Sequence, residues 1–385
     1  MQIAARYQAA IEVLDQITAG LAAERALTQW ARGSRFAGSK DRAAVRDHVY
    51  DVLRNRGRAA WLGGGETGRA LILGLLRLQG IPPEDVFTGQ GHAPAPLSED
   101  DAPAPEGQAA ITQDTPQWLL DRLEPVFGTD LEDVLHKAAE RAPVYLRVNL
   151  KKTTPEACMA TLAEAGIQAE QMQSSRMALQ VTQGARQLRN SSAYLDGLIE
   201  FQDLSVQLAL EQINWPDQGR ILDYCAGGGG KALAMAALCD ARIDVHDAKR
   251  ERMVDIPIRA GRAGLDLREV ETEDLAGTRY DLVLCDVPCS GSGTWRRDPE
   301  ARWRLSEGGL AELCATQSLI LDQARALLGS GGRLVYMTCS LLREENEDQI
   351  AAFLARHSGF SLLKEARFDP RAQSDGFYMA ELSCL

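Results

Sequence analysis

The chain has 385 residues, of which 45% are hydrophobic and 25% charged, which is ordinary for a soluble globular protein of two or three domains. Its formal net charge of −12 excludes a globally basic, nucleic-acid-coating surface, although residues 1–60 carry ten Lys and Arg against six Asp and Glu. No apolar run approaches the roughly 20 residues that span a bilayer, and the first residues lack the layout of a signal peptide, so we expect a cytoplasmic protein.

Apolar residues recur at helical spacing through Tyr7–Leu21 and Val45–Val52, and RALILGLLRLQG (residues 69–80) indicates a more buried helix. Residues 1–80 are therefore predicted to form a small all-helical domain. Residues 81–112 are rich in Pro, Ala and acid and hold too little apolar surface to fold, which predicts a linker.

A helical connector is predicted over residues 113–142. It leads to a strand, PVYLRVNL (Pro143–Leu150), then a helix (Pro155–Ala165) that ends at Gly166, then a strand around MALQVT. This β-α-β order predicts a small α/β segment over residues 143–212.

The remaining residues, 213–385, alternate short apolar runs with helix-length segments. The runs are RILDYCA, RIDVHDA, YDLVLCD and RLVYMTCS, and the helical segments include Glu307–Leu328 and Arg343–Arg356. Runs without strict alternation are typical of strands that are covered on both faces. The pattern predicts a doubly wound, largely parallel α/β sheet of the Rossmann-like class, whose ligands lie outside the carboxyl ends of the strands.

The segment LDYCAGGGGKALAMAAL predicts a strand, a glycine-rich turn and a helix, an arrangement that brings backbone N–H groups close to a ligand. Cys225 and Ala232 exclude a phosphate-binding P-loop. Gly227, Gly229 and Ala232 fit the pattern G-x-G-x-x-A, and Asp247 lies twenty residues after Gly227, where an acid suits a ribose diol. This motif alone fits a nicotinamide cofactor, S-adenosylmethionine, or tight packing without any ligand.

Two cysteines stand just past the ends of predicted strands. Cys289 follows YDLVLCD and Cys339 ends RLVYMTC, and neighbouring strands lie ~4.8 Å apart. One cysteine in such a place is usually a core residue. Two that converge beside an acid, Asp286, favour nucleophilic catalysis on cytosine: a thiolate adds to C6 and activates C5, an acid stabilises the developing charge, and a second ionisable group assists release.

The remaining six cysteines add no C-x-x-C pair and no histidine partner, so we expect neither a zinc site nor disulfides.

Three segments resemble the RNA cytosine-5 methyltransferases of the RsmB/NOP2/Sun family: DVPCSGSGTWRRDPEARW (Asp286–Trp303), YMTCSLLREENEDQI (Tyr336–Ile350) and SDGFYMAEL (Ser374–Leu382). The resemblance runs from about Thr115 to the C-terminus. It implies a class I methyltransferase domain over residues 213–385 that uses S-adenosylmethionine, preceded by an RRM-like segment. It also implies small-subunit ribosomal RNA as the partner, with no membrane, no metal and a monomeric chain.

By the same resemblance, Cys339 is the nucleophile, Cys289 releases the product, and Asp286 contacts both the base and the methyl donor. The cofactor would be held by Asp247 at the ribose, Asp274 at the adenine, Asp286, and a loop made of Cys225, Ala226, Gly227, Gly228, Gly229, Gly230 and Lys231. Contacts to RNA phosphate are implied for Arg296, Arg297 and Arg302.

The loop departs from the family's usual C-A-A-P-G-G-K-T, since this chain has C-A-G-G-G-G-K-A. Without the proline we expect a more flexible unbound loop and a weaker affinity for the cofactor. At the N-terminus, DRAAVRDHVYDVLR resembles part of a NusB-like RNA-binding domain, which would be truncated here. Two alternatives stay open: an assembly factor that binds RNA without methylating it, and a nicotinamide oxidoreductase, which would leave both thiols without a role.

Overall fold

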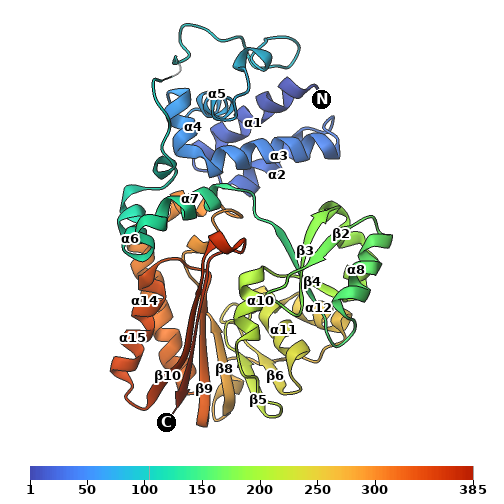
Figure 1. The fold of residues 1–385 in the computed structure, drawn as a ribbon, viewed down its shortest axis with the longest axis vertical. Helices are drawn as coiled ribbons and strands as arrows, with labels where there is room; N and C mark the ends of the chain where they lie inside the picture. The colour runs from blue at the N-terminus through green and yellow to red at the C-terminus, as the bar shows by residue number, and fades with distance from the viewer. Residues whose placement is uncertain (104, 385) are drawn as a thin grey trace. The chain divides into compact units, whose positions relative to one another are not determined.

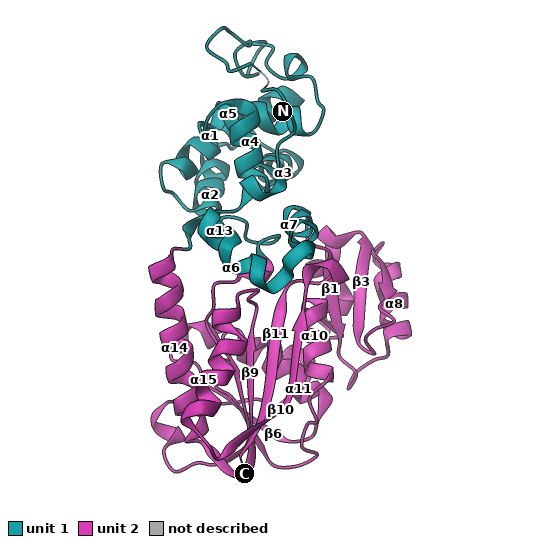
Figure 2. Ribbon diagram, turned by 60° about the vertical axis from the view of Figure 1, so that its left-hand side comes forward, with its two compact units in different colours: residues 1–141, 295–305 teal, residues 142–294, 306–385 magenta. Residues whose placement is uncertain are grey.

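The computed structural model describes residues 1–103 and 105–384. Figure 2 shows two compact units, residues 1–141 with 295–305 and residues 142–294 with 306–385. A search of the described residues finds no helix with the length and apolar character needed to span a membrane.

The first unit contains the predicted N-terminal helices. Its first helices are α1 (Ile3–Thr18), α2 (Ala23–Gly33), α3 (Ser39–Arg54), α4 (Arg56–Gly63) and α5 (Gly68–Leu78). The three segments with helical spacing are α1, α3 and α5, which confirms them as helices. They share one core, in which Val13, Val45 and Ile72 are fully buried.

Residues 81–112, which we expected to be a linker, pack on this helical core instead. Val86 and Phe87 are buried among its apolar side chains. Arg69 on α5 pairs with the carboxylate of Asp101 at 2.7 Å and donates to two backbone carbonyls of the same segment. The polar composition concealed two apolar anchors, and α5 supplies an arginine for Asp101. The segment contains the short turns η1 (Pro83–Asp85) and η2 (Ile111–Asp114).

Two further stretches belong to the first unit, contrary to the predicted boundaries. The expected connector forms α6 (Gln117–Phe127), η3 (Gly128–Asp130) and α7 (Leu131–Ala139). Residues 295–305, which include α13 (Ala301–Arg304), were expected to belong to the catalytic domain. Arg302 gives the reason: its guanidinium donates to the Asp114 carbonyl at 2.8 Å and to the Thr115 hydroxyl at 3.1 Å.

The second unit begins with a small antiparallel sheet of order β2-β3-β1-β4 (Figure 1). Its elements are β1 (Val144–Val148), α8 (Pro155–Glu164), β2 (Gln168–Gln171), β3 (Ala178–Gln183), η4 (Ala185–Asn190), α9 (Ser192–Leu195) and β4 (Ile199–Phe201). Leu146 and Val148 on β1 are fully buried against Leu162 of α8, which confirms the predicted α/β segment. Helix α10 (Leu204–Glu211) leads on to the large sheet.

The large sheet has the order β10-β11-β9-β8-β5-β6-β7. Its strands are β5 (Arg220–Asp223), β6 (Arg242–Val245), β7 (Arg268–Glu269), β8 (Tyr280–Asp286), β9 (Leu328–Thr338), β10 (Phe360–Phe368) and β11 (Phe377–Cys384). The first five are parallel, which confirms the prediction for β5, β6, β8 and β9, whereas β11 is antiparallel to both β9 and β10. The strand pattern predicted neither the short strand β7 nor the antiparallel β10–β11 pair.

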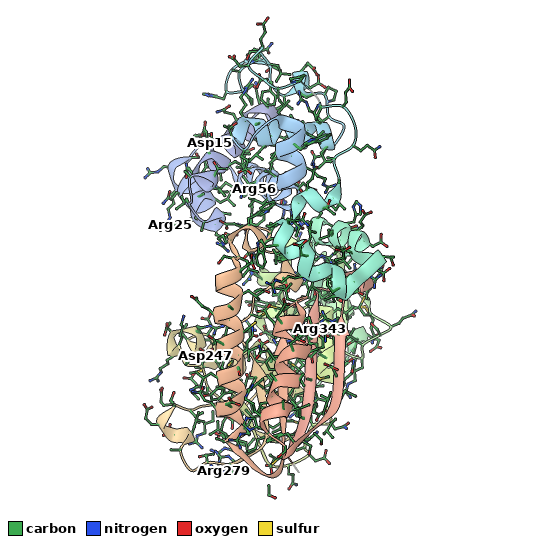
Figure 3. All side chains as sticks on the ribbon, turned by 90° about the vertical axis from the view of Figure 1, so that its left-hand side faces the viewer. Asp15, Arg25, Arg56, Asp247, Arg279 and Arg343 are labelled. Atoms are coloured by element: carbon green, nitrogen blue, oxygen red, sulfur yellow. The ribbon has the colours of Figure 1, made fainter. Side chains whose placement is uncertain are left out.

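Helices connect the strands of the large sheet and complete the predicted doubly wound fold. They are α11 (Gly230–Leu238), α12 (Ile256–Ala263), α14 (Glu307–Arg325) and α15 (Glu347–Arg356), with short turns η5 (Arg250–Met253), η6 (Glu273–Leu275), η7 (Ser292–Thr294), η8 (Arg343–Glu345) and η9 (Pro370–Ala372). Figure 3 shows the two ends of the sheet: Arg279 precedes β8 at the lower end, and Arg343 follows β9 at the upper, carboxyl end.

Candidate active site

The two predicted thiols lie side by side. Strands β8 and β9 run parallel with Asp286 opposite Met337, and each continues into a loop that carries one of the cysteines. The sulfurs of Cys289 and Cys339 are 3.4 Å apart, and both residues are partly exposed. The structure thus brings together the two side chains that the sequence places at neighbouring strand ends.

The environment of the pair raises the pKa of the Cys289 thiol. The hydrogen bond with Cys339, followed by burial and then by the charges of Cys339 and Glu345, raises the pKa of Cys289 well above the ordinary value of a thiol. The Cys289 thiol therefore stays protonated at neutral pH, and either sulfur can donate in the contact between them.

A buried carboxylate joins the two loops behind the thiols. Glu345 is fully buried in η8, and one of its oxygens accepts the Ser290 N–H at 2.8 Å and the Gln317 side-chain amide at 2.9 Å. Its other oxygen accepts the hydroxyl groups of Ser290 and Ser340. Because each of these serines directly follows one of the cysteines, a single charge holds both loops in register.

Sequence reasoning missed Glu345, because the run REENED in which it stands is typical of a solvated helix start. The one available signal was that a serine follows each cysteine.

An ion pair stands next to the thiols. The Lys231 ammonium, at the start of α11, lies 2.6 Å from the carboxylate of Asp286 at the end of β8. Burial lowers the pKa of Lys231, but Asp286 and the Cys339 sulfur outweigh burial and leave that pKa raised. Lys231 therefore stays charged and places a cation close to both Asp286 and the Cys339 sulfur. The family resemblance places Lys231 in the cofactor loop alone, without this second role.

The glycine loop crosses from β5 to α11, and Asp247 holds it from the end of β6. The Asp247 carboxylate accepts the Gly227 N–H at 2.9 Å and the Lys249 N–H at 2.9 Å, and pairs with Arg252 at 3.1 Å. A carboxylate offers about four acceptor positions, so one is left for a ribose hydroxyl. Gly229 has φ +77°, where a Cβ would lie 2.9 Å from Ile256, so this turn needs glycine.

Asp223, the last residue of β5, is the unusual group of this site. It is 1% exposed, and its carboxylate makes no hydrogen bond of normal geometry to a described residue. Burial, followed by the charge of Asp286, raises the pKa of Asp223 to about 7. An unpartnered acid beside a glycine loop and a ribose-type acceptor fits a cofactor that joins a nucleoside to an amino acid, as S-adenosylmethionine does. Cys225, next in this loop, has its pKa raised by burial and by Asp223, so it remains a thiol.

Asp274, the predicted adenine contact, is exposed in η6 and accepts the Glu271 N–H at 3.2 Å. The turn is tied to the glycine-loop strand by His246, which sequence analysis missed. Its Nδ1 lies 2.9 Å from the Tyr224 carbonyl and its Nε2 2.9 Å from the Thr272 hydroxyl. Because a carbonyl only accepts, Nδ1 donates the hydrogen bond to Tyr224.

The structure contradicts two of the three predicted phosphate contacts, those of Arg302 and Arg296. Arg302 is fully buried and donates hydrogen bonds to Asp114 and Thr115 within the first unit. Arg296 is 3% exposed. The spacing of the arginines in the motif could not reveal that α13 packs into the helical unit. Arg297 alone of the three is exposed, so it stays a prediction.

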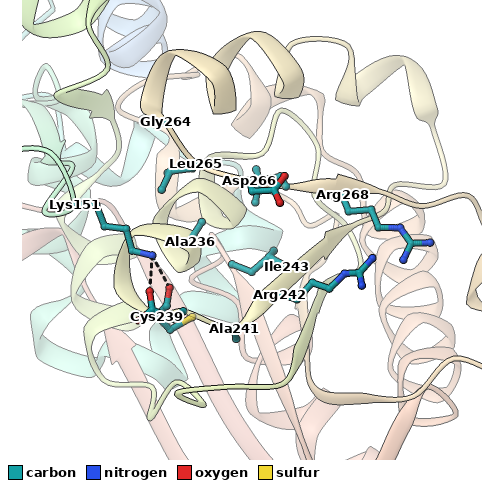
Figure 4. Close-up of a pocket in the computed structure, with 12 residues that line it drawn as sticks. Lys151, Ala236, Cys239, Ala241, Arg242, Ile243, Gly264, Leu265, Asp266 and Arg268 are labelled. Carbon is teal, nitrogen blue, oxygen red and sulfur yellow. Dashed lines mark hydrogen bonds and ion pairs between the residues drawn. The ribbon is translucent and has the colours of Figure 1, made fainter.

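The sheet also has a pocket that lies away from this chemistry. Figure 4 shows a cavity of about 740 Å³ lined by Lys151, Cys239, Arg242 and Arg268. Arg242 and Arg268 begin β6 and β7, so this pocket lies at the amino end of the sheet, opposite to the thiols. Among the described residues, no group of three or more His, Cys, Asp or Glu side chains is placed to hold a metal ion.

Comparison with known proteins finds families and structures that are similar to this chain. Residues 210–383 match the family described as "16S rRNA methyltransferase RsmB/F", and residues 115–186 match its ferredoxin-like domain. A Ribosomal RNA small subunit methyltransferase B from Xanthomonas campestris pv. campestris is 31% identical over 302 residues, covering 72% of this chain and 68% of that protein. The protein of the same name from Serratia proteamaculans is 31% identical over 69% of this chain; the match spans 66% of its length.

Solved structures share the fold. A crystal structure titled PH0851 superposes with a TM-score of 0.80 at 23% identity over 99% of both chains. The structure of NSun6 from Pyrococcus horikoshii with SFG, an analogue of S-adenosylmethionine, has a TM-score of 0.63 at 19% identity and covers 70% of this chain and 98% of that one. At these identities the likeness concerns the fold.

Proposed function

Because the chain belongs to the RsmB/F family of 16S rRNA methyltransferases, we propose that it transfers a methyl group from S-adenosylmethionine to C5 of a cytidine in small-subunit ribosomal RNA. The observation that carries this proposal is the 3.4 Å contact between the sulfurs of Cys289 and Cys339, beside the ion pair of Lys231 and Asp286.

The glycine loop and its acids would hold the cofactor, which supplies an electrophilic methyl group when bound. Asp247 would accept from the ribose, the backbone from Cys225 to Lys231 would line the methionine part, and Asp274 would face the adenine. Asp223 offers an acceptor for a cationic or N–H group of the ligand, which would restore its ionised form.

In the addition step, the Cys339 sulfur attacks C6 of a cytosine that has left its stack. Asp286 accepts a hydrogen bond from the N4 amino group and orients the ring. Lys231, next to both Asp286 and Cys339, stabilises the thiolate before attack and the negative charge that moves into the ring during it. C5 then carries the electron density needed to take the methyl group.

Release is assigned to Cys289. Cys289 lies 3.4 Å from the Cys339 sulfur and is therefore beside the adduct. It gives its proton to solvent, and its thiolate then takes the proton from C5. The C5–C6 double bond forms, the C6–S bond breaks, and Cys339 leaves as a thiolate. One proton is released to solvent in each cycle, and it corresponds to the C5 hydrogen that the methyl group replaces.

The test uses purified protein, S-adenosylmethionine and small-subunit rRNA, with bisulfite sequencing as the readout. Cys339→Ala should reduce methylation to background, because the proposed nucleophile is removed. Cys289→Ala should accumulate a protein–RNA adduct that is stable in denaturing gels. Cys314→Ala, in α14, is the matched control and should methylate normally. Free turnover by Cys289→Ala would refute the release role.

The two alternatives can be separated from this proposal by binding alone. Calorimetry with S-adenosylmethionine should show saturable heat, whereas a factor that only binds RNA should show none. Mixing with NADH should leave the nucleotide's fluorescence unchanged, and an enhancement would favour an oxidoreductase.

A further inference from the structure

The glycine loop lacks the proline that is usual in its family, yet two of its carbonyl groups are held from outside. The guanidinium of Arg259, on α12, donates to the Gly228 carbonyl. Arg147, on β1 of the small sheet, donates to the Gly230 carbonyl at 2.8 Å. Both donors come from elements distant in sequence, so the order of this loop depends on tertiary contacts.

A buried acid fixes these arginines. Glu200, on β4, is 6% exposed; it accepts a second nitrogen of Arg259 at 2.9 Å and also pairs with Arg262. Glu200 is the cross-strand partner of Arg147 in the small sheet. Burial lowers the pKa of Arg147 to about 10, offset in part by Glu200, so its guanidinium remains charged at neutral pH. The small sheet therefore contributes two charged residues: Arg147 bonds to the cofactor loop directly, and Glu200 binds Arg259, which also bonds to it.

We propose that Arg259, held by Glu200, is a positioning residue that orders the four-glycine loop before the cofactor binds and so replaces the rigidity of the missing proline. Gly228 stands at the proline's position in the family pattern. Four consecutive glycines lose a large conformational entropy on ordering. A bridge from a partly buried arginine to a loop carbonyl limits those conformations in the free protein. The inference rests on the proposed function only in naming the ligand.

The chain offers a matched pair of arginines for the test. Arg262 binds the same glutamate one helical turn from Arg259, but it makes no contact with the loop among the described interactions. Arg259→Gln and Arg262→Gln therefore remove the same charge from the same acid, and only the first removes the loop contact. Arg259→Lys keeps a positive charge for Glu200, but it has a single nitrogen in place of the two that bond to Glu200 and to Gly228. It replaces Arg259→Gln in the test if the glutamine variant does not fold.

Gly228→Pro provides the rescue. Gly228 is not in the left-handed region, and a Cβ there would meet only the tip of Arg259 at 3.2 Å, which a flexible side chain can yield. No hydrogen bond donated by the Gly228 N–H is found among the described residues, so a proline would remove none. If proline and Arg259 do the same work, the effect of losing the arginine should shrink in the proline background.

Hydrogen exchange of the free full-length protein is the first readout. Exchange of the amides from Gly227 to Lys231 should rise about tenfold in Arg259→Gln and less than twofold in Arg262→Gln. Calorimetry with S-adenosylmethionine is the second: the dissociation constant should rise about tenfold in Arg259→Gln and less than threefold in Gly228→Pro/Arg259→Gln. Equal exchange in both arginine variants, or no rescue by proline, would overturn the inference. Wild-type protein that binds no S-adenosylmethionine would instead refute the proposed function, while the exchange result still decides the role of Arg259.

Discussion

The two loops that carry Cys289 and Cys339 (the thiol loops) and the glycine loop lie at the same carboxyl edge of one sheet, but they are held by different means. The thiol loops are joined by Glu345, whose partners Ser290, Ser340 and Gln317 are all buried and neutral. The glycine loop is held by arginines of α12 and the small sheet, of which Arg259 is 23% exposed. The first arrangement fixes the spacing of the two cysteine loops through buried neutral partners, and the second orders the glycine loop through charges that are partly exposed.

The largest expected effect tests the rigid side. In Glu345→Gln, one carboxylate oxygen is replaced by an amide nitrogen, which cannot accept a hydrogen bond. At least one hydrogen bond to this side chain is therefore lost, and its buried donor is left without an acceptor. We expect the free energy of unfolding to fall by about 3 kcal/mol and the melting temperature by roughly 5–10 °C. Asp348→Asn, which breaks a pair between exposed groups nearby, should change stability by less than about 1 kcal/mol. If both variants melt alike in thermal denaturation, Glu345 does not join the loops.

A pH effect should distinguish two buried acids of the large sheet, Asp223 and Asp244. The folded pKa of Asp223, about 7, lies above its unfolded value, so the folded state binds more protons between about pH 4 and pH 7. Its contribution to stability is therefore lost as pH rises through that window, by an amount on the order of 4 kcal/mol. Asp223→Asn should flatten the decline of melting temperature between pH 5 and pH 8.

Asp244 is the contrast, since it is equally buried but bonded to Arg220 at 2.6 Å and to the Tyr280 hydroxyl at 3.0 Å. Asp244→Asn should destabilise the protein at all these pH values. A steeper pH dependence in Asp223→Asn than in the wild type would contradict the raised pKa of Asp223.

The smallest expected effect is that of salt. Raising ionic strength should weaken the partly exposed Arg259–Glu200 pair more than the buried bonds of Glu345. Hydrogen exchange of the glycine-loop amides should increase about twofold to threefold between roughly 0.05 and 0.5 M salt. The Ser290 and Leu341 amides, which bond to buried side chains, should be unaffected. An equal salt response in both loops would show that they are held by similar forces.

Much of the fold was predictable because its signals are local. The strands β5, β6, β8 and β9 are short apolar runs separated by helix-length segments, and their parallel pairing follows from that alternation. The pairing alone places Cys289 beside Cys339. The β10–β11 hairpin lacked such a signal, because strand β10 is largely exposed and its residues alternate weakly.

The errors share one cause, which is contact between residues distant in sequence. Composition predicted a linker over residues 81–112, but Val86 and Phe87 anchor it to the helical core. Arg302 stands in a motif of surface character, yet Asp114 and Thr115 bury it. Glu345 and Glu200 were overlooked because nothing in their own segments distinguishes a buried acid from a solvated one.

The sequence by itself determined which residues are candidates for catalysis, because a cysteine after each of two consecutive strands and an acid beside them are local properties of the chain. Only the tertiary structure decided how these groups behave. The proton of Cys289, the cation next to Asp286 and the order of the glycine loop all depend on charges and hydrogen bonds brought from elsewhere in the chain. Electrostatic effects act through space, so the order of residues in the chain does not contain them directly.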